Sequence, residues 1–158
     1  MKRTRSKLKL AGGTDASDWT SVEFGSSLDR AREVECDIVE CCQKNCFGED
    51  DIFAIKLALE EALVNAVKHG NNLDPAKVVK VQYHINCQRA DIAIEDQGNG
   101  FNPAELPDPT DEANLEKCSG RGILLMRAYM TSVVFNPAGN KVTLTKFNES
   151  YQPNVAMG

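Results

Sequence analysis

Residues 52–71 read IFAIKLALEEALVNAVKHGN, and this stretch decides the fold. Most of it is apolar and free of Gly and Pro, which predicts a helix of about four to five turns. Glu61, Asn65 and Lys68 follow the spacing i, i+4, i+7, so they form one narrow polar stripe along that helix. Burying an unpaired polar group costs about 2–7 kcal/mol. The stripe therefore lines a wet cleft or holds a charged ligand, unless it is only the solvated edge of an amphipathic helix.

The composition is that of a single soluble domain. The chain has 158 residues, of which 42% are hydrophobic and 26% charged, enough for a buried core. No run approaches the roughly 20 apolar residues of a membrane helix, and no signal-peptide pattern follows the basic N-terminus. Six cysteines without a C-x-x-C pair indicate reduced thiols. We therefore expect a cytoplasmic protein that does not contact a membrane.

Charge is distributed unevenly along the chain. The sequence holds 23 acidic and 18 basic residues, and five of the basic ones precede residue 10, namely Lys2, Arg3, Arg5, Lys7 and Lys9. The rest of the chain is therefore strongly acidic, which argues against direct nucleic-acid binding. We expect residues 1–18 to be a basic, disordered leader, residues 19–148 to form one domain, and residues 149–158 to be a tail.

The predicted elements follow the order β-α-α-β-β-loop-α-β-β. The expected strands span residues 19–25, 77–86, 90–95, 131–135 and 141–147. The expected helices run from Leu28, capped by Ser27 or Ser26, to Gly48, from Asp50 or Asp51 to Gly70, and from Ile123 to Tyr129 or Met130. Two hairpins and a short first strand predict a two-layer α/β sandwich, with a mixed, mostly antiparallel sheet and helices on one face.

Two glycine clusters flank a long, polar, proline-containing segment. Gly98 and Gly100 follow a strand that ends in Asp96, and Gly120 and Gly122 precede a helix. Glycine permits close backbone approach to a ligand, and the free N–H groups of a helix N-terminus favour phosphate. A carboxylate at the end of a strand can accept a hydrogen bond from an exocyclic amine. Each cluster alone also occurs in plain turns, but together with the polar stripe they indicate a metal ligand, a base-recognition group and a phosphate cradle.

Three segments resemble the conserved boxes of one superfamily. EEALVNAVKHGN resembles the N box of the GHKL (Bergerat-fold) ATPases, DQGNGF the G1 box, and GRGILLM the G2 box. The resemblance covers residues 22–147, and within the superfamily the chain is most similar to the stand-alone anti-sigma-factor serine kinases. A histidine kinase's phosphoacceptor helix and a transducer domain are absent from the sequence. The resemblance implies the Bergerat fold, ATP as substrate and Mg²⁺ as its companion ion.

The resemblance also implies roles for individual residues. Asn65 would bind Mg²⁺ through its side-chain oxygen, since Mg²⁺ prefers oxygen ligands. Glu61 would be the general base that receives the proton of a protein serine, and Asp96 would accept from the adenine amine. Residues 101–120 would form the ATP lid. The other implied nucleotide contacts are Lys68, His69, Gly98, Gly100, Gly120, Arg121 and Gly122.

Two of these positions leave alternatives open. His69 is equally well explained as a helix C-terminal residue that the helix macrodipole favours. The family commonly carries a Thr after the Gly of the last hairpin, whereas here Gly139 is followed by Asn140 and Lys141. Asn140 can still form a hydrogen bond near adenine.

The resemblance implies a regulatory kinase. We expect an ATP-dependent protein-serine kinase that phosphorylates a STAS-type anti-sigma-factor antagonist and sequesters a sigma factor. The alternative is a nucleotide-gated binding module without significant phosphotransfer, because binding and catalysis use the same boxes. A detached histidine-kinase catalytic domain would need a separate partner with a histidine. The family also implies a homodimer, for which strand 19–25 would offer a sheet edge.

Overall fold

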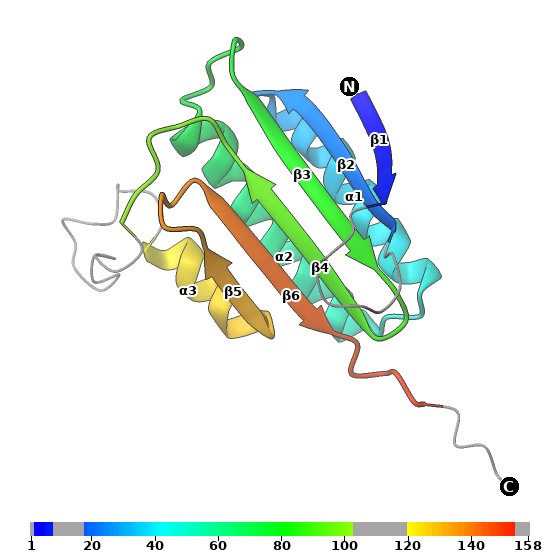
Figure 1. Cartoon of the computed structure of the whole chain (residues 1–158). Coiled ribbons are helices and arrows are strands. Elements are labelled where there is room, and N and C mark those ends of the chain that lie inside the picture. The colour runs from blue at the N-terminus through cyan, green and yellow to red at the C-terminus, as the bar shows by residue number, and fades with distance from the viewer. Residues whose placement is uncertain (1, 8–17, 103–119, 154–158) are drawn as a thin grey trace, which may run out of the picture.

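The computed structural model describes residues 2–7, 18–102 and 120–153. Within these ranges the strands form a single sheet in the order β1-β2-β3-β4-β6-β5 (Figure 1). The strands are β1 Lys2–Lys7, β2 Asp18–Gly25, β3 Val78–Ile85, β4 Arg89–Glu95, β5 Ser132–Phe135 and β6 Lys141–Phe147. The helices are α1 Leu28–Lys44, α2 Glu49–Val64, the π-helix η1 Asn65–Gly70 and α3 Gly120–Tyr129.

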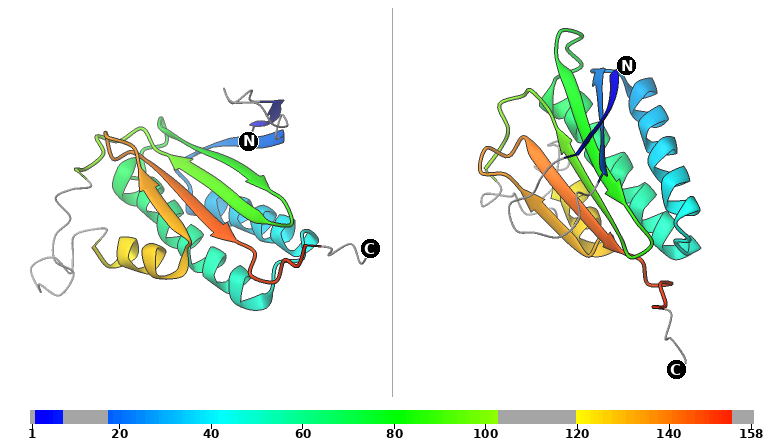
Figure 2. Two further views of the ribbon diagram at one scale, coloured as in Figure 1. Left: turned by 60° about the horizontal axis from the view of Figure 1, so that its bottom comes forward. Right: turned by 45° about the vertical axis from the view of Figure 1, so that its right-hand side comes forward.

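The helices cover one face of the sheet, and α2 lies between α1 and α3 (Figures 1 and 2). Alternation along β3 buries Val79, Val81 and Tyr83, as expected where one face of a strand meets a core. From the helix layer, Ile55 and Leu59 of α2 are fully buried in the same cluster. The predicted two-layer α/β sandwich is confirmed. Every pairing among the described strands is antiparallel, so the expected parallel component of the sheet is not seen there.

The expectation of a wholly disordered leader is wrong for Lys2–Lys7. This segment forms β1, which pairs antiparallel with β2. The Arg3 guanidinium also donates to the Asp37 carboxylate on α1. Composition did not reveal the strand, because β-pairing is made by the backbone and needs no apolar side chains.

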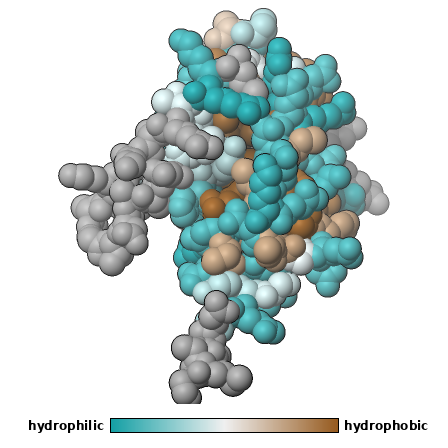
Figure 3. Space-filling view, turned by 90° about the vertical axis from the view of Figure 1, so that its right-hand side faces the viewer, coloured by the Kyte–Doolittle hydropathy of each residue, from teal (hydrophilic) through white to brown (hydrophobic). Residues whose placement is uncertain are grey.

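A consequence of this pairing is that β2 is not the edge of the sheet. The prediction that strand 19–25 offers a free edge for dimerisation is therefore wrong, because β1 occupies that edge. Figure 3 shows this side of the molecule, where hydrophilic side chains predominate and hydrophobic ones form smaller patches. Exposed lysine and arginine on an edge strand are a common protection against unwanted strand pairing.

The first helix begins as predicted and ends earlier. The Ser27 side chain accepts from the Arg30 N–H, as an N-cap does. The helix ends at Lys44, and Asn45 closes it by donating its side-chain amide to the Cys41 carbonyl at 2.8 Å. Gly48, the predicted end of this helix, instead caps the N-terminus of α2. A side-chain cap therefore ends the helix before the glycine is reached.

The second helix changes type at its functional end. α2 begins at Glu49 and ends at Val64, and the chain continues as a π-helix through Asn65–Gly70, where an unbroken α-helix was expected. The Asn71 N–H donates to the Ala66 carbonyl five residues earlier, at 2.9 Å. Single π turns within helices are frequent at functional sites. Hydrophobic spacing did not predict this turn because it is one wider turn in an otherwise regular helix.

Some expectations fall outside the described ranges. The predicted long loop is described only at its first residue, Asn102, because residues 103–119 lie outside those ranges. Cys118 falls in the same gap, and the other five cysteines are free thiols. None of the helices described here has both the length and the hydropathy needed to cross a membrane.

Candidate functional site

A cavity of about 260 Å³ opens between η1, the ends of β4 and β6, and α3. This is just below the usual volume range of small-molecule pockets. Its apolar walls come from the sheet and α3, including Ile94, Met126 and Val142, and Phe101 and Phe135 pack edge to face on it with ring centroids 5.1 Å apart. Four residues predicted from the sequence line it, namely Asn65, His69, Gly100 and Asp96.

Asp96 is fixed at the end of β4. Its Oδ1 accepts the Gly98 N–H at 2.8 Å. Gly70 packs directly on the carboxylate, because a Cβ at position 70 would lie 2.3 Å from the Asp96 Cγ. Burial raises the pKa of Asp96, an effect that exceeds the opposing one of the Gly98 hydrogen bond. A partly desolvated carboxylate that retains acceptor capacity suits the recognition of an exocyclic amine.

The glycines of the Asp-Gln-Gly-Asn-Gly turn allow two close backbone approaches. A Cβ at Gly98 would lie 2.1 Å from the Gly70 carbonyl oxygen, so this turn packs against the end of η1. Gly100 has a φ of 71°, and a Cβ there would lie 1.9 Å from the Ala138 carbonyl oxygen in the β5–β6 hairpin. The turn after β4 is therefore held between the helix layer and the last hairpin, which shapes the mouth of the cavity.

Asn71 is a site residue that the sequence did not reveal. It is fully buried, with its Nδ2 donating to the Val78 carbonyl at 3.0 Å. Its Oδ1 accepts the Gln97 N–H at 2.7 Å. One side chain thus ties the end of η1 to the start of β3 and to the turn that carries Asp96. Nothing in the sequence distinguishes Asn71 from the exposed Asn72 beside it, because only the tertiary structure brings β3 and the turn together.

Asn140, in the position of the family Thr, contacts the main chain of Asp96 and not its carboxylate. The Asp96 N–H donates to the Asn140 carbonyl at 2.9 Å, and the Asn140 Nδ2 lies 3.3 Å from the Asp96 carbonyl. Asn136 holds the Asn140 side chain by donating to its Oδ1 at 2.7 Å. Asn140 lines the cavity and supports the turn that carries Asp96.

Glu61 and Asn65 meet the first turn of α3. A Cβ at Gly122 would lie 2.8 Å from Oε2 of Glu61 and 3.6 Å from Nδ2 of Asn65. Glu61 is half-buried and does not line the cavity itself, whereas Asn65 does. The predicted pairing of a carboxylate and a carboxamide one turn apart therefore lies where the cavity meets the N-terminus of α3.

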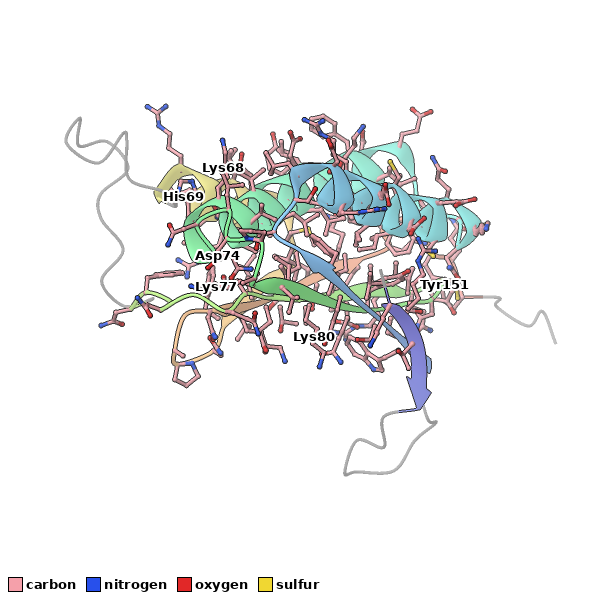
Figure 4. All side chains as sticks on the ribbon, turned by 90° about the horizontal axis from the view of Figure 1, so that it is seen from above. Lys68, His69, Asp74, Lys77, Lys80 and Tyr151 are labelled. Carbon is pink, nitrogen blue, oxygen red and sulfur yellow. The ribbon has the colours of Figure 1, made fainter. Side chains whose placement is uncertain are left out.

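The remaining predicted residues lie at or beyond the rim of the cavity. Lys68 and His69 are both exposed, but Lys68 points away from the sheet in Figure 4, whereas His69 also lines the cavity. The π turn explains the difference, since its wider winding places His69 in line with Asn65. Burial, and to a lesser degree Lys68, lowers the pKa of His69, which favours the neutral imidazole. Arg121 is exposed and does not line the cavity, and Gly120 is the first residue of α3.

The groups present fit a nucleotide and its metal ion. The cavity combines apolar walls with the half-buried Asp96 carboxylate, which suits a base with an exocyclic amine such as adenine. The side-chain oxygen of Asn65 is the kind of hard ligand that Mg²⁺ prefers. A side chain at position 122 would collide with the Glu61 carboxylate, so glycine there lets the first turn of α3, whose N–H groups favour phosphate, lie close to Glu61 and Asn65.

The comparison with known families covers most of the chain. Residues 24–146 match the family described as "Histidine kinase-like ATPase domain". The chain also resembles a solved structure of the RsbU and RsbW domains of a Mycobacterium tuberculosis protein, with a TM-score of 0.52 and 17% identity. That match covers 84% of this chain and 33% of the solved one, and it supports the fold alone.

Curated relatives fall within the same family. An anti-sigma F factor of Geobacillus stearothermophilus is 30% identical over 105 residues, which is 65% of this chain and 71% of that protein. An anti-sigma F factor of Clostridium perfringens is 35% identical, covering 60% and 69%. The serine-protein kinase RsbW of Bacillus licheniformis is 27% identical, covering 84% and 87%. The chain belongs to the histidine kinase-like ATPase domain family, alongside the anti-sigma F factors and the serine-protein kinase RsbW.

Proposed function

We propose that this chain is an ATP-dependent protein-serine kinase that acts as an anti-sigma factor. The observation that carries the proposal is the contact of Glu61 with Gly122 beside Asn65, at the edge of the cavity that holds Asp96. This arrangement supports the proposal, because it brings the Glu61 carboxylate, the proposed base, close to the first turn of α3. Adenine recognition by Asp96 would lie on the opposite side of the same cavity.

In the proposed reaction, a serine hydroxyl oxygen of the protein substrate forms a bond to the γ-phosphorus of ATP, and the bond from that phosphorus to the β-phosphate oxygen breaks. Glu61 accepts the hydroxyl proton. The N–H groups at the start of α3 stabilise phosphate charge, since positioning and electrostatics provide most of the catalysis in phosphoryl transfer. Mg²⁺, when bound, neutralises phosphate charge, and Asn65 would hold it.

The names of the relatives support a sigma factor as one partner. We propose that the chain sequesters a sigma factor, as the name anti-sigma F factor suggests, and that its phosphorylation substrate is a STAS-type anti-sigma-factor antagonist. We propose a cytoplasmic homodimer as the working form. Among the described strands, the sheet edges available to such a dimer are β1 and β5, not β2.

Transfer of labelled γ-phosphate from ATP and Mg²⁺ into a purified STAS-domain protein of the same organism tests the proposal. We expect the wild type to give an acid-stable phosphoserine product. Glu61→Gln should lower the rate by about 10²–10⁴-fold, the usual contribution of a general base, with ATP binding retained. Glu60→Gln is the matched control, because Glu60 is the neighbouring carboxylate on the exposed side of α2.

Two outcomes would contradict the proposal in different ways. Phosphate transfer at the wild-type rate by Glu61→Gln would show that Glu61 is not the general base, while the proposed kinase activity would stand. No product with the wild type, while ATP is bound and this binding changes the affinity for the partner, would favour a nucleotide-gated binding module.

A further inference from the structure

An apolar strip runs along the outer side of the helix layer, between α2 and α3. It consists of Phe53 and Leu57 on α2 and of Leu125 and Tyr129 on α3. Phe53 is 58% exposed, Tyr129 38% and Leu125 36%, whereas Leu57 is half-buried. Contiguous exposed apolar side chains of this kind mark interaction sites more often than chance scatter does.

The strip leads to Glu61. The rings of Phe53 and Tyr129 meet edge to face, with centroids 6.0 Å apart, while Glu61 meets Gly122. The two helices therefore run antiparallel, with one contact at each end. Phe53, Leu57 and Glu61 are spaced four residues apart, so they share one side of α2. The rise of an α-helix places Phe53 about 12 Å from Glu61 along the axis.

The groove on the other side of α2, between α1 and α2, has a mixed lining. Its charged side chains are Arg32, Glu35, Lys56 and Glu60, and they stand among apolar residues such as Leu63. Burial, followed by the charge of Glu60, raises the pKa of Glu35 in this groove. The apolar strip differs from this groove because none of its four residues is charged, and because Phe53 and Leu57 share the side of α2 that carries Glu61.

We propose that this apolar strip is the docking surface for the protein substrate. The inference rests on the proposed function, because it assumes that a protein serine delivers its proton to Glu61. A general base must lie within about 2.6–3.2 Å of the atom that loses the proton. The protein surface around the acceptor serine must therefore cover the surroundings of Glu61, and the strip is the apolar part of those surroundings.

The occupant is a folded protein that presents apolar side chains beside its acceptor serine. Aromatic residues are enriched in the buried centres of protein interfaces, and tyrosine is enriched among the residues that dominate binding energy. The ring contact between Phe53 and Tyr129 holds both aromatic side chains in place before the substrate arrives, which lowers the entropy cost of docking. The apolar strip continues to Glu61, the proposed base, and only a protein that delivers its serine to Glu61 has to cover that surface. This favours the substrate over a second copy of the chain as the occupant.

The test measures the steady-state kinetics of phosphate transfer from ATP to the purified STAS-domain protein. We expect the double variant Phe53→Ala, Tyr129→Ala to lower kcat/KM for the protein substrate by about tenfold or more, through KM. The affinity for ATP should stay unchanged, because the altered rings lie away from the cavity. The melting temperature should fall only slightly, because the variant loses one ring contact between two exposed side chains. Val134→Ala is the matched control, since Val134 is also 58% exposed but lies on β5. Phe53→Tyr should keep the wild-type KM.

Three results would overturn the inference, and they can be told apart. Equal kinetics of the double variant and Val134→Ala would show that the strip is not the docking surface, while the proposed kinase activity would stand. A change in oligomeric state with an unchanged KM for the substrate, seen by light scattering, would make the strip an interface between copies. No transfer by the wild type would overturn the proposed function itself and the docking surface with it.

Discussion

Gly122 and Glu61 meet so closely that no side chain fits between them. A Cβ at position 122 would lie 2.8 Å from Oε2 of Glu61, and the Asn65 amide is the next nearest group at 3.6 Å. The crowded atom is the far end of a flexible side chain and not backbone. A methyl group added at Gly122 would therefore displace the carboxylate and leave the packing of α2 on α3 intact.

Gly122→Ala should separate catalysis from folding. We expect phosphate transfer to fall by about 10-fold to 10²-fold, because small misplacements of a catalytic group have effects of this size. The melting temperature should not fall, since Ala is about 1 kcal/mol more favourable than Gly in a helix. Transfer assays and thermal unfolding of the same preparation measure both effects. An unchanged transfer rate would show that Glu61 tolerates displacement and would argue against its role as base.

Gly98→Ala should damage the fold at the site. The added Cβ would lie 2.1 Å from the Gly70 carbonyl oxygen. This oxygen belongs to the backbone, which cannot move aside as a flexible side chain does. We expect a loss of about 1–3 kcal/mol in the free energy of unfolding, the usual cost of overpacking. ATP affinity should fall as well, because the turn also positions Asp96. Urea unfolding and nucleotide titration test this, and wild-type values in both would contradict the close approach.

Asn71→Ala should destabilise the protein and weaken ATP binding together. The change removes a fully buried side chain and leaves the Val78 carbonyl and the Gln97 N–H without their partner in a partly buried place. Each unsatisfied group costs about 1–3 kcal/mol. Asn72→Ala is the matched control, because Asn72 is the exposed neighbour. If both variants unfolded at the same urea concentration, Asn71 would have no bridging role.

Asp96→Asn should stabilise the protein while impairing the site. Burial raises the pKa of Asp96 above its unfolded value. A carboxyl group of this kind favours folding when protonated, so its contribution is fully present below the unfolded pKa, near 3.9, and is lost as the pH rises through the folded pKa. At pH 7 the neutral amide should therefore raise the melting temperature, and this advantage should shrink as the pH falls toward about 4.

The same variant should bind ATP about tenfold more weakly or worse, because a charged acceptor forms the stronger hydrogen bond to the adenine amine. Thermal unfolding at pH 7 and at pH 4, together with nucleotide titration, measures both effects. A lower melting temperature at pH 7 would contradict the destabilising burial of the Asp96 charge.

Local chemistry explains which parts of the fold were predictable. The start of α1 was predictable because its N-cap, Ser27, lies within one turn of it. The β3–β4 and β5–β6 hairpins were predictable because neighbouring residues encode the alternation of the strands and the short turns between them. The Glu61–Asn65 pair was also predictable, since one α-helical turn separates them. The exposed position of Lys68 beside the cavity was not predictable, because the π-helix after Val64 changes the winding at that point, and its contact with the nucleotide stays a prediction.

The sequence by itself determined the helices, the hairpins and the three boxes that carry the chemistry, because each depends on residues close together in the chain. The tertiary structure alone decided the contacts between distant segments. It paired Lys2–Lys7 with β2, brought Asn71 under the turn of Asp96, and set Gly122 against Glu61. Such contacts depend on how the layers pack, and packing joins residues whose separation in the sequence carries no periodic signal.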